Sequence, residues 1–122
     1  MFNEKFLDVL SHEGVVALVT CGGGEAHVCN TWNSYLTVKN GKLLLPAGGM
    51  EKTRENIVQN CNVKLTVGSK EVMGKYYMGT GFLVEGIAKV LDHGEGYDLM
   101  KEKFPWLSAV VEVTPKSVTQ TM

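Results

Sequence analysis

The sequence lacks the features of a membrane or exported protein. It has no long apolar run, and its first residues, Met1–Lys5, show neither the charged nor the apolar region of a signal peptide. It also lacks an excess of charge of one sign. Its 12 basic residues face 13 acidic ones, with no basic run that would attract nucleic acid or an anionic membrane. We therefore expect a cytoplasmic protein that binds no nucleic acid and no membrane.

Cysteine and histidine are few and widely scattered. The three cysteines are odd in number and form no Cys-x-x-Cys pair, so the sequence encodes neither a disulfide framework nor a zinc site. The three histidines lack the spacing of metal ligands. A catalytic triad, a pair of carboxylates and an activated cysteine are missing as well. The sequence therefore predicts no metal site and no catalytic residue, and it disfavours a hydrolase.

The apolar residues suffice for one compact core. The chain has 122 residues, of which 44% are apolar and 20% charged. This composition predicts a single domain over residues 1–122. A domain of this size can fold without disulfides or structural metals, and dimerisation would bury further surface.

Most of the chain predicts β-strands joined by tight turns. Strands are expected over residues 15–20, 26–38, 42–46, 63–69, 80–91 and 108–113, with short helices near residues 3–10, 50–60 and 95–104 and a polar tail after the last strand. Asn40-Gly41 predicts a hairpin because both residues tolerate positive φ. Gly86 predicts a bend within its strand, and Pro46 is expected to end another. The pattern favours a mainly β fold with short helices, an antiparallel Greek-key-type barrel rather than a doubly wound parallel sheet.

The segment Gly48-Gly49-Met50-Glu51-Lys52-Thr53-Arg54 has the chemistry of a phosphate site. The glycines let backbone N–H groups approach an anion, the following helix start adds partial positive charge, and Lys52, Thr53 and Arg54 add charge and donors. Basic residues in a first helical turn oppose the helix dipole, so a bound phosphate would remove that repulsion. The alternative is a plain Gly-Gly turn whose basic side chains point into solvent.

The segment Asn30-Thr31-Trp32-Asn33-Ser34-Tyr35 brings amide, hydroxyl and aromatic side chains together. As a strand, it would place Asn30, Trp32 and Ser34 on one face and Thr31, Asn33 and Tyr35 on the other. Amides and hydroxyls suit a polyhydroxyl chain, and an indole suits a flat aromatic ring. The alternative is a sheet with one polar face and Trp32 in the core.

Three further regions are candidates for a site or an interface. The segment Glu71–Met78, followed by Gly79-Thr80-Gly81, predicts a loop that either borders a site or merely connects a hairpin. Trp106 and Met122 are apolar residues where exposure is expected, which is typical of interfaces. Glu13 lies near a helix end, where a turn-capping carboxylate is favoured over a charge at a site.

The two long segments, Asn30 to Leu36 and Pro46 to Thr53, closely resemble the short FMN-binding proteins of sulfate-reducing bacteria. These belong to the pyridoxamine 5′-phosphate oxidase-like split-barrel group. The resemblance extends from Glu13-Gly14-Val15-Val16-Ala17 to Gly79-Thr80-Gly81-Phe82-Leu83, and it implies a split β-barrel that binds flavin mononucleotide (FMN). The sequence departs from the family pattern at Tyr76 and Tyr77, which puts contacts from that loop in doubt.

The resemblance also implies a homodimer with one non-covalent FMN per subunit at the subunit interface. Lys52 and Thr53 would hold the phosphate, and Asn30 and Thr31 would lie near the ribityl chain. Trp32, Tyr35 and Trp106 would surround the isoalloxazine ring, with the N–H groups of Gly48 and Gly49 at its reactive edge and Met122 over the partner's ring. The full set of candidate cofactor-binding residues is Asn30, Thr31, Trp32, Asn33, Tyr35, Pro46, Ala47, Gly48, Gly49, Lys52, Thr53, Thr80, Gly81, Trp106 and Met122.

The leading functional hypothesis is an electron-transfer flavoprotein, in which the protein adjusts the flavin potential by packing and hydrogen bonds. Its partners would be a second copy of itself and either a redox protein or a nicotinamide or other small-molecule reductant. The enzymatic alternative is an FMN-dependent oxidoreductase, such as a flavin reductase or a pyridoxamine phosphate oxidase-like enzyme. The latter is disfavoured because Arg54 is the only arginine available for a second phosphate. A haem-binding or flavin-free interaction domain is a third possibility.

Overall fold

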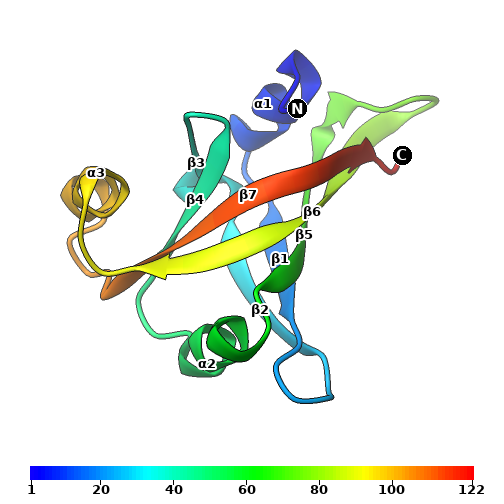
Figure 1. Ribbon diagram of the computed structural model, residues 1–122. Helices are drawn as coiled ribbons and strands as arrows, with labels where there is room; N and C mark the ends of the chain where they lie inside the picture. Colours follow the sequence, from blue (N-terminus) through cyan, green and yellow to red (C-terminus); the bar gives the residue numbers. More distant parts are fainter.

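Seven strands and three short helices make up the fold, and the computed structural model describes all residues 1–122 (Figure 1). The strands are β1 (Val15–Thr20), β2 (His27–Trp32), β3 (Thr37–Lys39), β4 (Lys42–Ala47), β5 (Asn62–Met73), β6 (Met78–Leu91) and β7 (Ala109–Gln120). The helices are α1 (Glu4–Leu10), α2 (Glu51–Gln59) and α3 (Glu95–Lys103), and a 3₁₀ turn, η1 (Asn33–Tyr35), separates β2 from β3. None of the helices is long and apolar enough to span a bilayer.

The strands form one antiparallel sheet in the order β2-β1-β5-β6-β7-β4-β3. The sheet curves into a half-barrel, with α2 below it and α3 to one side in Figure 1. Strands β2 and β3 are the two ends of this order, so the half-barrel is open between them. The fold is therefore the mainly β split barrel with short helices that the sequence predicted.

The main hydrophobic core is a cluster of 19 buried residues contributed by the sheet, α1 and α2. Helix α1 closes one end of the barrel, because Phe6 and Val9 are fully buried and the Phe6 ring meets the Phe82 ring edge-on at 5.4 Å. The Asn3 side chain accepts a hydrogen bond from Phe6 N at 2.8 Å, which confirms the predicted helix and its cap. A second cluster lies under α3 and consists of Leu44, Met100, Leu107 and Val110.

Two glycine positions behave as the sequence predicted. Asn40 and Gly41 both have positive φ, 53° and 74°, and they turn the chain from β3 into β4. At Gly86 the register between β6 and β7 shifts, and a Cβ there would lie 2.3 Å from Thr114 O. Glycine is needed at this bulge because the neighbouring strand approaches too closely for any side chain.

The predicted strand over residues 26–38 is wrong, because the chain has to cross the opening of the barrel between β2 and β3. The crossing is made by η1, whose first residue, Asn33, donates its N–H to Gly14 O at 2.9 Å. Burial nevertheless alternates through the turn. Thr31 and Asn33 are buried while Trp32 and Ser34 are exposed, so the pattern resembles that of a strand although the backbone does not.

Three predicted boundaries are also corrected. Strand β4 continues through Pro46, which pairs with Val110 of β7; β3 reaches only as far as Leu44, so no strand needs the missing N–H of Pro46. The expected loop over residues 71–78 is instead a β5–β6 hairpin with its tip at residues 74–77. The expected polar tail is strand, because β7 stays paired with β6 as far as Gln120.

Candidate functional site

Helix α2 begins without a side-chain cap. Its N-cap residue, Met50, has left-handed backbone angles (φ 56°, ψ 39°), and the first main-chain bond of the helix runs from Arg54 N to Met50 O at 2.9 Å. The N–H groups of the first turn therefore carry the positive end of the helix dipole without a capping oxygen. Lys52 is exposed beside them and makes no ion pair and no side-chain hydrogen bond. This end of α2 can accept an anion.

Thr53 joins α2 to β2. It is fully buried, and its Oγ1 donates a hydrogen bond to Cys29 Sγ at 3.3 Å. One turn later, Asn56 Nδ2 donates to Thr20 Oγ1 of β1 at 3.1 Å, which holds the same face of the helix against the sheet. Arg54 points elsewhere, because its Nη1 donates to Ser108 Oγ at 3.2 Å. Lys52 is therefore the free cation of this turn.

The outer face of β2 carries Asn30 and Trp32. Both side chains are exposed, Trp32 by 45%, while Thr31 between them is buried. Asn30 Nδ2 donates to Val16 O at 3.2 Å, which fixes the amide on the strand. The alternative prediction, in which Trp32 packs in the core of the sheet, is wrong.

An aromatic cluster lies beside the glycine loop. The rings of Tyr35, Phe104 and Trp106 pack with centroid distances of 5.0, 5.6 and 5.6 Å. A Cβ on Gly48 would lie 3.1 Å from the Trp106 ring, so glycine lets the indole lie against the loop. Ser108 holds the loop from the other side, because its Oγ donates to the carbonyl of Ala47 at 3.2 Å and to that of Gly48 at 3.1 Å.

Asn33 does not share a surface with these groups. It is fully buried, and its Nδ2 donates to the carbonyls of Val9, His12 and Gly68 at 3.2, 2.9 and 2.9 Å. Its side chain therefore joins α1, the approach to β1, and β5. The prediction that Asn33 contacts a cofactor is not supported by this position, since the amide is committed to backbone carbonyls.

Thr80, Gly81 and Met122 lie together at the other end of the molecule. Thr80 Oγ1 donates to the main-chain oxygen of Met122 at 2.8 Å, and Thr121 N donates to Gly81 O at 2.9 Å. In Figure 1 the C-terminus lies at the upper right, whereas α2 lies at the bottom. One protomer therefore separates the candidate residues into two groups, one around α2 and β2 and one at the C-terminus.

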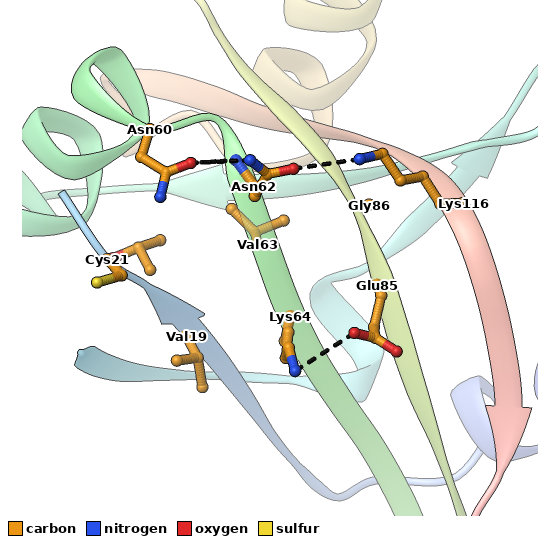
Figure 2. A pocket seen from close by; sticks show the side chains of 10 residues that line it. Val19, Cys21, Asn60, Asn62, Val63, Lys64, Glu85, Gly86 and Lys116 are labelled. Carbon is orange, nitrogen blue, oxygen red and sulfur yellow. Dashed lines mark hydrogen bonds and ion pairs between the residues drawn. The ribbon is translucent and has the colours of Figure 1, made fainter.

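One hollow, of about 580 Å³, lies against α2 and is lined by Glu51, Arg54, Glu55, Val58, Val90, Asp92, Ser108 and Ala109. Figure 2 shows another of about 290 Å³, lined by Val19, Thr20, Cys21, Asn60, Asn62, Val63, Lys64, Glu85, Gly86 and Lys116. Its polar groups satisfy one another, because Lys64 pairs with Glu85 at 3.3 Å and Lys116 Nζ donates to Asn62 Oδ1 at 3.2 Å. A further hollow, at the hairpin tip, includes the candidate residue Met122. Lys52 and Trp32 line none of these hollows and are exposed on the open surface.

Glu13 accepts hydrogen bonds from Ser34 of the 3₁₀ turn η1 and from Gly14. Its Oε2 accepts from Ser34 Oγ at 2.7 Å, and its Oε1 accepts from the N–H groups of Ser34 and Gly14 at 3.2 Å each. The hydrogen bond from the Ser34 hydroxyl, followed by that from its N–H, lowers the pKa of Glu13 below its ordinary value, against a smaller opposing effect of burial. The prediction of a turn-capping carboxylate is confirmed.

A curated relative identifies the family. The FMN-binding protein of Nitratidesulfovibrio vulgaris Miyazaki F is 41% identical to this chain over 123 residues, which cover 100% of both chains. This chain belongs to the FMN-binding protein family. No protein-family model matches it.

Solved structures show that this family member shares its fold with more distant proteins. HupZ of Group A Streptococcus has a TM-score of 0.82 at 14% identity, covering 98% of this chain and 94% of HupZ. An FMN-binding protein of Syntrophomonas wolfei has a TM-score of 0.70 at 15% identity, covering 88% of this chain and 76% of that one. At such low identity these likenesses establish the split barrel alone.

Three residues of this surface were not predicted from the sequence. Phe104 stacks with Tyr35 and Trp106, Ser108 holds the glycine loop, and Cys29 accepts the Thr53 hydroxyl bond. Phe104 could have been found from its place beside Pro105 and Trp106. The other two give no sequence signal, because their roles depend on β7 and α2 meeting partners far away along the chain.

Proposed function

We propose that this protein binds one FMN non-covalently per subunit of a homodimer and acts as an electron carrier. The observation that carries the proposal is the uncapped start of α2, with the unpaired cation Lys52, after a loop whose Gly48 lies against the exposed Trp106. A second exposed indole, Trp32, lies on β2. A phosphate and a flat aromatic ring need these two surfaces side by side. The family membership supports FMN as the molecule that has both.

The residues at the start of α2 fit the phosphate. Main-chain N–H groups of the first turn and the Lys52 ammonium would neutralise its charge, and charge-assisted bonds of this kind are the strongest available. Thr53 would contribute its hydroxyl, which is now donated to Cys29 Sγ. Because Thr53 is fully buried in the structure, binding would require its hydroxyl to exchange this weak sulfur contact for a bond to a phosphate oxygen.

The rest of the surface fits the ribityl chain and the ring. Asn30 would contact the ribityl hydroxyls, and the buried Thr31 would take part through its main chain. Trp32, Tyr35 and Trp106 would pack against the isoalloxazine, and Gly48 and Gly49 are exposed, so their N–H groups can approach its edge. FMN itself supplies the capacity to accept and release electrons. The side chains here pack, orient and exclude water.

A homodimer would complete this surface. Val15 and Val28 are exposed on the same sheet face as Trp32, next to the proposed FMN. The second group, Thr80, Gly81 and Met122, lies at the opposite end of its own protomer (Figure 1). A two-fold arrangement can bring the C-terminus of one subunit over the FMN of the other, where the flexible Met122 side chain would cover the ring.

Carriage of electrons is favoured over an enzymatic role by the side chains that would surround the ring. They are indole, phenol, amide and hydroxyl groups, which set a potential through packing and hydrogen bonds rather than by donating a proton. Steady-state oxidation of NADH and NADPH, with free flavin or a quinone as acceptor, tests this assignment. Turnover well above that of free FMN would indicate an FMN-dependent oxidoreductase rather than an electron carrier.

The visible spectrum of the protein purified without added cofactor tests the proposal as a whole. A yellow protein with flavin bands, one FMN per chain and the mass of a dimer is the expected result. A Soret band would indicate haem instead. A colourless protein that takes up no added FMN would overturn the proposal.

A further inference from the structure

The tip of the β5–β6 hairpin carries the two most exposed aromatic side chains of the protein. Tyr76 is 83% and Tyr77 80% exposed, and their ring centroids lie 6.5 Å apart. Met73 and Met78 face each other at the base of the tip, and both are exposed. An exposed patch of two tyrosines and two methionines is unusual for the surface of a soluble protein, and such patches often mark protein–protein interaction sites.

The tip and the C-terminal residue form one unit. The main-chain oxygen of Met122 accepts hydrogen bonds from Lys75 N at 3.3 Å, Thr80 Oγ1 at 2.8 Å and Gln120 Nε2 at 3.1 Å. Gly74 allows this approach, because a Cβ there would lie 2.9 Å from the same oxygen. A hollow of about 410 Å³ lies between the two segments and is lined by Lys75, Tyr76, Tyr77, Met78, Gly79, Thr121 and Met122. Any interface that contains Met122 would therefore also contain Tyr76 and Tyr77.

A second exposed apolar surface lies on the outer face of β1 and β2. Val15 pairs with Trp32 and Val19 with Val28 across the two strands, and of these Val15, Val28 and Trp32 are exposed. Strand β2 ends the sheet order, so nothing in the protomer covers this face from the side. Like the hairpin tip, it leaves large apolar side chains in solvent.

We propose that the Tyr76–Tyr77 tip docks on the β1–β2 face of a second copy of this chain, where its rings cover the FMN bound there. The proposal rests on the proposed function, since it places the tyrosines at that FMN site. The charges around the two surfaces match. Lys5, Lys70 and Lys75 lie on or against the tip, whose one acidic side chain is Glu71. Glu13 and Glu25 flank the β1–β2 face, and Lys64 of the adjoining β5 is paired with Glu85.

Two-fold symmetry indicates that the docking partner is a second copy of this chain. If the tip of one copy covers the β1–β2 face of another, the two-fold axis makes the second copy do the same to the first. Both exposed surfaces of each protomer are then buried by a single association. A different partner could cover either patch alone, but a second copy covers both, and it brings Met122 to the same place. The two tyrosines thus become cofactor contacts supplied in trans.

Replacement of both tyrosines tests the inference. We expect Tyr76→Ser/Tyr77→Ser to weaken FMN binding about tenfold, the effect of losing aromatic contacts of roughly 1.4 kcal/mol. Flavin fluorescence should rise, because rings that quench it by contact are lost. Tyr76→Phe/Tyr77→Phe keeps the rings and should resemble the wild type in both measurements. Val58→Ser is the matched control, since Val58 is also 83% exposed but lies on α2.

A mixed dimer shows whether the tyrosines act in trans. One subunit carries Lys52→Ala, which weakens its own FMN binding, so that at limiting FMN only the other site fills, but keeps its tyrosines. The other subunit carries Tyr76→Ser/Tyr77→Ser and keeps Lys52. Two affinity tags, used in succession, isolate the mixed dimer. Its single FMN is expected to bind and fluoresce as in the wild type, because the tyrosines of the Lys52→Ala subunit cover it.

Three results would count against the inference. If the double serine variant matches the wild type and Val58→Ser in FMN affinity and fluorescence, the tyrosines do not cover the flavin. If the mixed dimer behaves like the double serine variant, the tyrosines act in cis. If the wild type binds FMN as a monomer, the docking is wrong although the cofactor site stands. Failure of the wild type to bind FMN would instead overturn the proposed function, and the inference with it.

Discussion

The Asn33 amide shows how one side chain can hold several distant segments together. It donates to three carbonyls, those of Val9, His12 and Gly68, and its Oδ1 has no partner of its own. The neighbouring Gly14 is required, because a Cβ there would lie 2.8 Å from Asn33 Nδ2 and 2.2 Å from Gly68 O. The sequence predicted a cofactor contact at Asn33, and the structure shows its amide bonded to three backbone carbonyls.

Asn33→Ala should therefore destabilise the fold. The substitution leaves buried carbonyls without their donor, and we expect a loss of about 3 kcal/mol in the free energy of unfolding, measured by urea denaturation. Asn62→Ala is the control, since Asn62 is exposed and should change stability by less than about 0.5 kcal/mol. Equal losses for both variants would contradict the structural role of Asn33.

Lys52→Ala tests the proposed phosphate contact. Loss of a charge-assisted bond should weaken FMN binding roughly 10- to 100-fold in a fluorescence titration. Added salt should reduce the difference in FMN affinity between the variant and the wild type. Lys89→Ala removes an equally exposed lysine from the outer face of β6 and should leave the affinity unchanged. An effect of the same size at both positions would mean that only net charge matters.

Glu13 predicts a pH dependence of stability. Its pKa is lowered in the folded protein, chiefly by the Ser34 hydroxyl, so its contribution is fully present above the ordinary value of 4.5 and is lost as the pH falls through the lowered pKa. The Glu13→Gln variant should be less stable than the wild type near neutral pH. The difference should shrink as the pH falls through the lowered pKa of Glu13, in urea denaturation series at several pH values. A difference that stays constant with pH would exclude this titration as its source.

At the scale of elements, local signals were predicted well and long-range pairings were not. Asn40-Gly41, Gly86 and the helix after Gly49 were found because each depends on backbone preferences within a few residues. The break at η1, the extension of β5 and β6 to the hairpin tip and the length of β7 depend on which strands meet, and periodicity carries no such information. The same division holds for the candidate site: Phe104, Ser108 and Cys29, which contact residues of the two motifs, were not predicted.

Gly86→Ala tests the bulge in β6. A methyl group would lie 2.3 Å from Thr114 O, so the two strands must separate, at a cost of about 1 to 3 kcal/mol in the free energy of unfolding. Gly23→Ala is the matched control, because a Cβ there meets only the end of the Gln59 side chain at 3.5 Å. Thermal unfolding of the two variants is sufficient to compare them. A stable Gly86→Ala variant would mean that the bulge can relax.

At the scale of the whole molecule, the exposed apolar face of β1 and β2 predicts a charge-sensitive dimer. Val28→Lys places an unpaired charge in the proposed interface, and we expect the dimer dissociation constant to rise at least about tenfold, measured by analytical ultracentrifugation. Val58→Lys places the same charge on an exposed position of α2 and should leave the dimer intact. A Val28→Lys protein that remains as dimeric as the wild type would place the interface elsewhere.

In the proposed dimer, the length of strand β7 would set the distance between the two flavin sites. The strand begins just after Trp106, beside one subunit's proposed flavin, and its 12 residues, a contour of about 40 Å, end just before Met122, over the other's. Because side chains alternate along a strand, an insertion of one residue would turn the terminal side chain to the opposite face, whereas an insertion of two would only displace it. In the proposed dimer, the spacing between the two cofactors, and whether the terminal side chain faces the ring, would thus depend on the length of a single strand.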